Sequence, residues 1–403
     1  MNPSTQPKAK DPFAFAYHAM IKPSGSECNI DCDYCFYLHK QALLTQPKHP
    51  RMDLATLETH IKQYIEAQTS EEVVFTWQGG EPTIMGLDFF KQAITLQKRY
   101  AKPRQRIVND LQTNGLLLDD AWCEFLKQEN FLVGVSIDGT AELHDKLRKT
   151  KNQKPTHALV MRAIDKLHAH QVPFHALCVV NSHNSKEPLK VYRFLKDVVR
   201  PRMIQFLSAV EPTHFIKKPT NYIFKSSTHS HSIVTDWSVS PQQWGEFLCV
   251  IWQEWLKNDF GRVFIDQFEN TISQALGFGA QKCTTAPICG KAVAIEHDGS
   301  LYSCDHFVYP QYKLGNIHHT HQGSLVFSKQ QASFSYAKHL KLPSDCKQCD
   351  YLKLCWGECP KNRFINDSTG EAGLNYLCQG LKKFYRQVIH DLPIIRIKLR
   401  HQL

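Results

Sequence analysis

Three closely spaced cysteines carry the clearest chemical signal in this sequence. Cys28, Cys32 and Cys35 fall within eight residues, separated by three and then by two residues, and Phe36 and Tyr37 follow at once. Three thiolates around one point can hold an iron–sulfur cubane by three of its four irons, which leaves the fourth iron open to a small-molecule ligand. An electron carrier uses four cysteines per cluster, so the open position indicates chemistry at the metal. A three-thiol zinc site and three unrelated cysteines are the alternatives.

A second group of cysteines lies in the last third of the chain. It comprises Cys283, Cys289, Cys304, Cys346, Cys349, Cys355, Cys359 and Cys378. Eight thiols divide into two four-thiol sites, which suit either iron–sulfur clusters or zinc, since Cys-x2-Cys pairs are common in zinc ribbons. The three-cysteine loop favours iron–sulfur clusters. Three further cysteines stand apart in apolar patterns and are predicted to be buried small hydrophobic side chains: Cys123, Cys178 and Cys249.

The composition is that of an ordinary globular protein, with 42% hydrophobic and 21% charged residues. The sequence has no apolar run of about eighteen residues and no apolar signal-peptide core, so it predicts a cytoplasmic protein without membrane contact. Fourteen cysteines in a reducing compartment point to metal or catalysis. The formal charge of +10 counts thiols as neutral, and three cubanes on eleven thiolates contribute roughly −5. Nucleic acid is therefore not a predicted partner.

The elements that must position the first three cysteines alternate between strands and helices. Strands are predicted at residues 15–21, 73–77, 107–112, 132–137, 174–180 and 203–207. Helices are predicted at 54–67, 87–100, 120–129, 158–170 and 189–198. This alternation predicts a parallel sheet covered by helices, as either an open doubly wound sheet or a partial barrel. In both, functional groups gather at the carboxyl ends of the strands.

Short motifs stand where the first four predicted strands end. The cysteine loop follows the first strand, and the motifs Gln78-Gly79-Gly80-Glu81-Pro82, Gln112-Thr113-Asn114-Gly115 and Ser136-Ile137-Asp138-Gly139 follow the next three. Gly79 and Gly80 lack a Cβ, so the backbone can approach a ligand closely. Glu81 offers a charged acceptor for a ligand amino group. Elsewhere a Gly-Gly pair is usually a simple turn.

The second half of the chain predicts a separate cysteine-rich domain. The polar stretch 211–237, with His229 and His231, reads as a binding loop or lid. Amphipathic helices at 241–256 and 268–276 follow, and 293–302 is predicted to be a hairpin turning at Asp298-Gly299. We expect a flexible tail at 1–12, a barrel domain at 13–240, bridging helices at 241–282, and the cysteine-rich domain with a C-terminal helix at 283–403.

The cysteine loop resembles that of the radical S-adenosylmethionine (SAM) enzymes, and the later cysteines resemble the SPASM extension. A closer resemblance, from about residue 15 to 390, is to the anaerobic sulfatase-maturating enzymes. It is carried by Cys35-Phe36-Tyr37, Trp77-Gln-Gly-Gly-Glu-Pro-Thr83, Leu111-Gln-Thr-Asn-Gly115, Val133-Gly-Val-Ser-Ile-Asp-Gly139, Gln205-Phe206 and Leu374-Asn-Tyr376. The resemblance implies an α/β fold, with a partial (β/α)6 barrel followed by a small domain that binds two auxiliary clusters.

The resemblance also implies roles for individual residues. Three [4Fe–4S] clusters are implied: a SAM-binding cluster on Cys28, Cys32 and Cys35, a first auxiliary cluster on Cys283, Cys289, Cys304 and Cys359, and a second on Cys346, Cys349, Cys355 and Cys378. The SAM contacts implied are Tyr34, Gly80, Ser136, Arg148 and Val210, with Gln78, Gly79 and Glu81 beside them. Asp305 matches the family's catalytic base, and Tyr37 matches a residue near the substrate.

The chemistry implied is oxidation of a peptidyl Cys or Ser to Cα-formylglycine. A 5′-deoxyadenosyl radical removes hydrogen from Cβ, a proton goes to Asp305, and an electron goes to an auxiliary cluster. The implied partners are an unfolded or nascent sulfatase with a Cys/Ser-x-Pro-x-Arg segment and a low-potential electron donor such as flavodoxin or ferredoxin. The enzyme is expected to be a monomer. Glu211 is a candidate carboxylate for the substrate arginine.

Two other classes of protein share parts of the pattern. Another SPASM enzyme would form thioether or carbon–carbon cross-links on a ribosomal peptide, but Asp305 directly after Cys304 and the Cys-Phe-Tyr motif favour sulfatase maturation. A zinc or iron–sulfur module without SAM chemistry leaves the Gly-Gly-Glu-Pro and Ser-x-Asp-Gly motifs unexplained. SAM cleavage and the peptide product distinguish the three.

Overall fold

A ten-stranded sheet organises the chain. The computed structural model describes residues 17–215 and 233–400, so the predicted tail, the start of the first predicted strand, His229 and His231 lie outside the described residues. The strand order is β12 (Lys313–Asn316), β11 (Ser300–Tyr302), β10 (Ala292–Glu296), β1 (His18–Lys22), β3 (Glu72–Trp77), β4 (Arg106–Thr113), β5 (Leu132–Ser136), β7 (Phe174–Val180), β8 (Met203–Ser208) and β9 (Phe264–Ile265).

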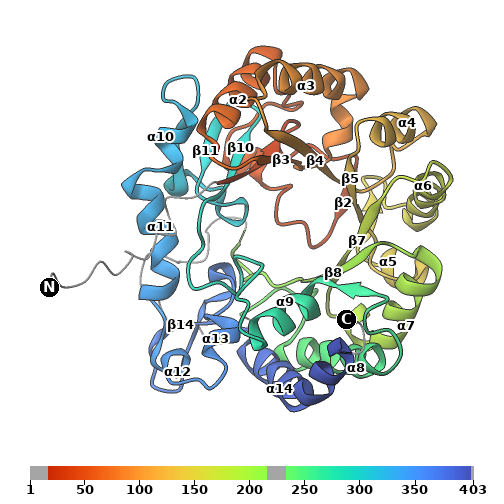
Figure 1. Cartoon of the computed structure of the whole chain (residues 1–403), viewed down its shortest axis with the longest axis vertical. Coiled ribbons are helices and arrows are strands. Elements are labelled where there is room, and N and C mark those ends of the chain that lie inside the picture. The colour runs from red at the N-terminus through yellow and green to blue at the C-terminus, as the bar shows by residue number, and fades with distance from the viewer. Residues whose placement is uncertain (1–16, 216–232, 401–403) are drawn as a thin grey trace, which may run out of the picture.

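Every neighbouring pair of strands from β10 to β9 is parallel. The six predicted strands correspond to β1, β3, β4, β5, β7 and β8. The sheet curves from β10 through β5 to β8 with helices around its outside (Figure 1), so of the two predicted architectures the partial barrel is confirmed. The carboxyl ends of the parallel strands meet along one rim, as parallel barrels require.

Helices cross over between the parallel strands. They are α2 (Leu54–Ala67), α3 (Leu87–Tyr100), α4 (Asp120–Gln128), α5 (Ala141–His144), α6 (His157–Ala169), α7 (Pro188–Arg193) and α8 (Pro241–Asn258). Local capping explains where several begin: Asp53 accepts from Thr56 N at 2.7 Å, and Ser240 forms a capping box with Gln243.

The predicted helix at 189–198 differs from the structure. Only Pro188–Arg193 is α-helical, and a π-helical turn at Phe194–Val199 follows it. The turn ends at Arg200, which has a left-handed backbone with φ of 51°. Pro201 follows, and a residue before proline is disfavoured in the right-handed helical region, so the helix cannot continue.

The core lies between the sheet and its helices. Side chains on the helix-facing side of successive strands are fully buried, as Ile21, Phe75, Leu111 and Val133 show. Cys123, Cys178 and Cys249 are at most 5% exposed, which confirms their prediction as buried hydrophobic side chains. These three thiols therefore contribute to packing of the core.

The cysteine-rich region extends the same sheet. The predicted hairpin is present as β10 and β11, paired antiparallel through Ala294 and Tyr302, with Gly299 at φ 79° in its turn. Strand β10 also pairs in parallel with β1, from His18 opposite Ala292 to Lys22 opposite Glu296. The hairpin therefore joins the first strand of the barrel, an arrangement that the local pattern did not predict.

Further helices and strands lie in the second half of the chain. They are α9 (Asp266–Ala275), α10 (Gln322–Val326), α11 (Lys329–Leu340), α12 (Ser344–Lys347), α13 (Leu352–Cys355), β13 (Ile365–Asn366), β14 (Ala372–Leu374) and α14 (Cys378–Arg400). Helix α10 packs on α2, and α14 packs on α8 and α9. Helix α14 packs on α8 at very short range: a Cβ on Gly380 would lie 2.0 Å from the Pro241 carbonyl oxygen. Only glycine permits this crossing. Among the described residues, every helix is too short or too polar to cross a bilayer.

Candidate active site

The three-cysteine loop leaves β1 and returns along a short two-stranded sheet. Strand β2 (Ile30–Cys32) pairs antiparallel with β6 (Arg148–Thr150), which places Cys32 opposite Arg148. The thiols of Cys28, Cys32 and Cys35 interact electrostatically with one another. Burial, the Glu81 carboxylate and Cys35 together raise the pKa of Cys28 to about 12. Thiols with such a raised pKa keep their protons at neutral pH. They become thiolates when a bound metal compensates the negative charge.

A buried chain of polar groups connects this loop to the end of β5. The Tyr34 hydroxyl donates to Asp138 Oδ2 at 2.5 Å, and Arg148 Nη1 donates to the Tyr34 oxygen at 2.8 Å. Burial raises the pKa of Tyr34 well above its ordinary value, which keeps the phenol protonated as a donor. Arg148 is 5% exposed, and its Nε has no hydrogen-bond partner among the described residues. An unpaired buried guanidinium nitrogen suits an anionic ligand group.

The glycine pair after β3 packs against residues 25–27, which directly precede the cysteine loop. Gly80 N donates to Gly25 O at 2.9 Å, and Glu81 N donates to Glu27 O at 2.8 Å. A Cβ on Gly80 would lie 2.0 Å from Glu27 O, so this position accepts only glycine. Gly79 has φ of 147°, which also favours glycine. The pair therefore fixes the cysteine loop against β3.

Glu81 is fully buried and already has several protein donors. Its Oε1 accepts from Thr83 N, Thr83 Oγ1 and Thr113 Oγ1, and its Oε2 accepts from Asn114 N at 2.7 Å. Burial, opposed by these hydrogen bonds, raises its pKa. Glu81 therefore ties the ends of β3 and β4 together. Its predicted contact with a ligand amino group stays a prediction.

The other predicted SAM contacts lie at the same rim. Ser136 ends β5 opposite Leu177 of β7. Gln78 accepts from Lys22 Nζ at 3.1 Å and donates to Gln112 at 2.6 Å. Val210 follows β8 and is 1% exposed. The ends of β1, β3, β4, β5 and β8 thus converge, as the strand-end motifs predicted.

The eight later cysteines separate into two groups of four in space. Cys304 interacts electrostatically with Cys359, Cys283 and Cys289. Cys346 interacts with Cys378 and Cys349, and Cys355 with Cys346 and Cys378. Within 17–215 and 233–400, no three His, Cys, Asp or Glu side chains converge tightly enough for a single metal ion. Wider four-thiol sets fit a cubane, because its thiolates bind different irons.

Asp305 lies directly after Cys304 and pairs with a lysine of the barrel. Its Oδ1 forms an ion pair with Lys22 Nζ, and both side chains are buried. Burial alone would raise the pKa of Asp305, but Lys22, His306 and Lys40 outweigh it and hold the pKa below its ordinary value. The carboxylate is therefore ionised at neutral pH and can accept a proton.

Tyr37 lies next to this ion pair. Lys22 Nζ is 4.4 Å from the centre of its ring. The Tyr37 hydroxyl donates to Glu296 Oε1, and Gln46 Nε2 donates to Glu296 Oε2 at 2.8 Å. Burial and then Glu296 raise the pKa of Tyr37 well above its ordinary value, so the phenol is neutral. The predicted base and the predicted substrate neighbour thus share one buried polar cluster.

Comparison with known proteins agrees with this geometry. Residues 23–195 match the radical SAM superfamily, and residues 283–350 match SPASM, an iron–sulfur cluster-binding domain. A serine-type anaerobic sulfatase-maturating enzyme of Bacteroides thetaiotaomicron is 44% identical over 97% of this chain and 94% of its own length. A cysteine-type enzyme of Clostridium perfringens is 32% identical over 91% and 94%.

This chain belongs to the anaerobic sulfatase-maturating enzymes. A solved structure described as native anSMEcpe with bound AdoMet and Cp18Cys peptide superimposes with a TM-score of 0.81, at 29% identity, covering 95% of this chain and 99% of that one. As a member of the family, the protein is a radical SAM enzyme.

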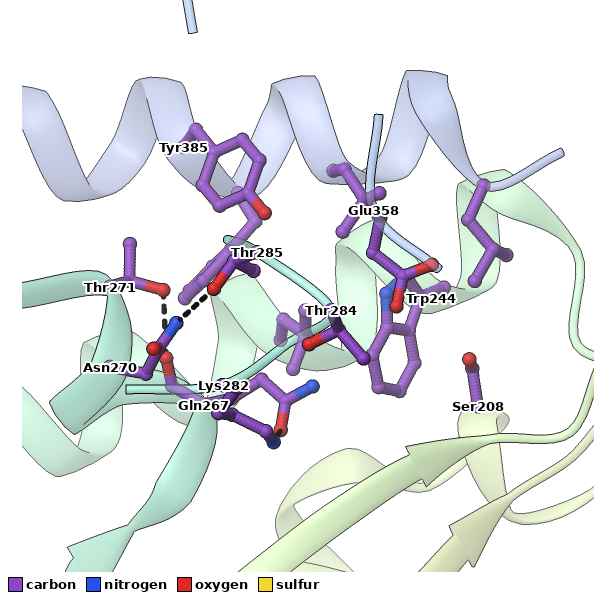
Figure 2. A pocket seen from close by; sticks show the side chains of 14 residues that line it. Ser208, Trp244, Gln267, Asn270, Thr271, Lys282, Thr284, Thr285, Glu358 and Tyr385 are labelled. Carbon is purple, nitrogen blue, oxygen red and sulfur yellow. Dashed lines mark hydrogen bonds between the residues drawn. The ribbon is translucent and has the colours of Figure 1, made fainter. Parts of the chain in front are cut away.

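A cavity lined by both polar and apolar side chains lies beside both auxiliary thiol groups (Figure 2). Lys282 and Thr284 flank Cys283, and Glu358 precedes Cys359. Across the cavity, Tyr385 of α14 interacts with Cys355. None of the predicted SAM contacts lines this cavity, so it is separate from the three-cysteine loop.

Several residues of the family's site were missed from the sequence. Lys22 and Glu296 were not named, and Asp138 was named only as part of the Ser136–Gly139 motif, although each contacts a predicted residue. Lys22 ends β1 and Glu296 ends β10, and both strands are otherwise mostly apolar. A charged residue at the end of such a strand could have indicated a place in the site. Glu211, the expected partner for a substrate arginine, is already paired with Lys361 at 2.9 Å. That pairing joins residues far apart in sequence and has no local signature.

Proposed function

We propose that this enzyme oxidises a Ser or Cys side chain of a sulfatase polypeptide to Cα-formylglycine, with Asp305 as the base. One observation carries the proposal: an ionised, buried carboxylate stands directly after an auxiliary-cluster cysteine and beside Tyr37 at the barrel rim. When bound, the clusters and SAM supply hydrogen-atom abstraction and an electron acceptor.

The oxidation of a side-chain CH2–OH or CH2–SH removes two electrons and two protons in total. One hydrogen atom leaves Cβ, one further electron must leave for an acceptor, which an auxiliary cluster would supply when bound, and the remaining proton leaves the hydroxyl or thiol. Asp305 would take that proton, because Lys22 keeps its carboxylate ionised until the substrate arrives. With a Cys substrate, water then replaces sulfur and releases hydrogen sulfide.

The proposed cofactor roles are supported by the grouping of the thiols. Cys28, Cys32 and Cys35 would hold the SAM-binding cluster, Cys283, Cys289, Cys304 and Cys359 the first auxiliary cluster, and Cys346, Cys349, Cys355 and Cys378 the second. Arg148 and Tyr34 would hold a SAM carboxylate or ribose, with Gln78, Gly79, Gly80, Glu81, Ser136 and Val210 around it. The unpaired Arg148 Nε supports this assignment.

The substrate would enter as an extended, unfolded or nascent segment, since its reacting Cβ must reach buried groups. We infer a low-potential carrier such as flavodoxin or ferredoxin as the electron donor, a monomeric enzyme and a cytoplasmic location. The 44% identical relative is serine-type, whereas relatives at 32% include both types. Peptides with Ser and peptides with Cys at the position to be oxidised therefore both need to be tested.

The test is anaerobic turnover of two peptides, one with Ser-x-Pro-x-Arg and one with Cys-x-Pro-x-Arg. Reconstituted, dithionite-reduced enzyme receives SAM, and the products are weighed. We expect 5′-deoxyadenosine with loss of two hydrogens from the Ser peptide, or exchange of hydrogen sulfide for oxygen in the Cys peptide. SAM cleavage with both peptides unchanged would redirect the assignment to another peptide modification.

A further inference from the structure

Two adjacent polar side chains beside the site, Lys40 and His39, have no hydrogen-bond partners among the described residues. Lys40, the first residue of α1 (Lys40–Leu43), is 1% exposed. Among the described residues, its Nζ has no hydrogen-bond partner, and both ring nitrogens of His39 are likewise buried without one. Burying an ammonium without acceptors costs several kcal/mol, so such groups usually have a ligand.

Aromatic rings enclose this pair on one side. Lys40 Nζ lies 3.2 Å from the centre of the Tyr309 ring. The His39 ring packs edge-on against Phe215 at 5.2 Å, and the Tyr309 hydroxyl donates to Phe215 O at 2.9 Å. Phe215 follows β8 and Tyr309 follows β11, so the barrel and the cysteine-rich region both form this wall. The Tyr309 ring face attracts the ammonium, but among the described residues no oxygen accepts a hydrogen bond from it.

Lys40 also interacts electrostatically with carboxylates around Asp305. The carboxylates of Glu211, Asp305 and Glu296 act on it, yet burial outweighs them and lowers its pKa to about 7. Each of these carboxylates already has another partner: Lys361 for Glu211, Lys22 for Asp305, and Tyr37 with Gln46 for Glu296. The ammonium donors of Lys40 are therefore left for a ligand.

The charge balance indicates a neutral ligand oxygen. The three carboxylates Glu211, Asp305 and Glu296 are matched by the three lysines Lys22, Lys40 and Lys361. A ligand carboxylate would add an unmatched negative charge in a buried region. A carbonyl oxygen satisfies the ammonium without that cost, and an extended peptide presents one at every residue.

We propose that Lys40 and His39 form a subsite that binds a main-chain carbonyl oxygen of the substrate polypeptide near the residue being oxidised. The subsite rests on the proposed function, because it requires a peptide substrate at Asp305. It positions the peptide and takes no part in the proton transfer.

Peptide binding tests the subsite. The probe is a fluorescent Ser-x-Pro-x-Arg peptide without acidic residues and with an amidated C-terminus, bound anaerobically to reconstituted enzyme with SAM. Loss of a hydrogen bond to a charged group costs about 1.5–3 kcal/mol, so Lys40→Met should weaken Kd by about 10- to 100-fold. Lys40→Arg should retain most of the affinity. Iron content and peptide-free SAM cleavage should match the wild type.

The chain offers a matched control. Lys196 is also partly buried, lies 5.2 Å from a tyrosine ring centre and pairs with Asp259 at 2.7 Å, but it stands on the helical layer. Lys196→Met should lower stability and leave peptide Kd unchanged. An unchanged Kd for Lys40→Met, or an equal loss for Lys196→Met, would overturn the subsite. A wild-type enzyme that binds no peptide would instead count against the proposed function.

Ester-substituted peptides test the same contact in the wild type, should Lys40→Met fail to take up iron. Replacing one amide by an ester weakens the carbonyl as an acceptor without changing the enzyme. We expect an ester at one position near the target serine to weaken binding to the wild type, and to weaken binding to Lys40→Arg by a similar factor, because arginine keeps a cationic donor. Equal affinity at every ester position would contradict the proposal.

Discussion

Lys22 Nζ and Asp305 Oδ1 form a buried ion pair that joins the end of the first barrel strand to the residue after Cys304. Lys22 also donates to Gln78, which donates in turn to Gln112. The predicted base is therefore part of a polar chain across β1, β3 and β4. Lys22 of the barrel makes the largest contribution to keeping it ionised, with a further contribution from His306, while the cysteine-rich region sets its position.

Asp305→Asn should separate SAM cleavage from peptide oxidation. The amide cannot accept the substrate proton, so aldehyde yield should fall by at least about 100-fold, the usual worth of a positioned base. Formation of 5′-deoxyadenosine should persist in part. Asp298→Asn is the control, because Asp298 lies in the hairpin turn and accepts from Ser300 N. An undiminished aldehyde yield would remove Asp305 from this role.

Lys22→Met should leave the Asp305 carboxylate buried and unpaired. Breaking a buried pair from one side costs about 3–5 kcal/mol, measurable as a loss of unfolding free energy in the reconstituted protein. Lys22→Met combined with Asp305→Asn should recover much of that loss, since no buried charge is then left unpaired. Additive losses in the double variant would show that the two side chains do not interact.

Changing Cys28, Cys32 and Cys35 together to Ala should abolish SAM cleavage while about eight irons per chain remain, from two four-iron clusters. The structure keeps these thiols apart from both four-thiol groups, so each set should load separately. Cys178→Ala is the matched control, since Cys178 is fully buried in β7. Complete loss of iron in the triple variant would require the thiol groups to be reassigned.

Gly80→Ala should impair SAM binding. The new Cβ would meet Glu27 O at 2.0 Å and push the cysteine loop away from β3. We expect weaker SAM binding and slower cleavage, with auxiliary iron retained. Gly86→Ala is the comparison, because Gly86 has φ of 77° but no neighbouring atom within 4 Å. It should cost about 1–3 kcal/mol of stability through backbone strain, without changing SAM affinity. Equal SAM affinity in both variants would contradict the packing argument.

Stability should depend on pH through His60 of α2. His60 is fully buried beside Gln322, and burial lowers its pKa from 6.5 to about 4. Between these values the unfolded chain binds a proton that the folded protein does not, so stability falls as pH falls. The loss from pH 7 to pH 5 is about 2 kcal/mol. His60→Gln should remove that part of the slope, measured as unfolding free energy against wild type at both pH values. Identical slopes would contradict it.

Local pattern predicted the elements of the barrel well. Helices 54–67 and 87–100 match because amphipathic periodicity is reinforced there by Asp53 and by the glycine before Leu87. The strand-end motifs were placed correctly at one rim, because parallel strands bring their carboxyl ends together. Contacts between distant segments were not predictable. The pairs Lys22 with Asp305, Tyr37 with Glu296, and Glu211 with Lys361 depend on how β10 docks on β1, which no local pattern specifies.

The position of β1 between β3 and β10 also constrains how the chain is made. One edge of β1 has no partner until Glu296 has left the ribosome, long after β3 is available. At typical rates of synthesis this delay is on the order of tens of seconds. During that time the nascent barrel presents an open edge strand directly before the three-cysteine loop. Completion of the barrel is therefore a late event in the synthesis of the protein, because β10 can pair with β1 only after most of the chain has been made.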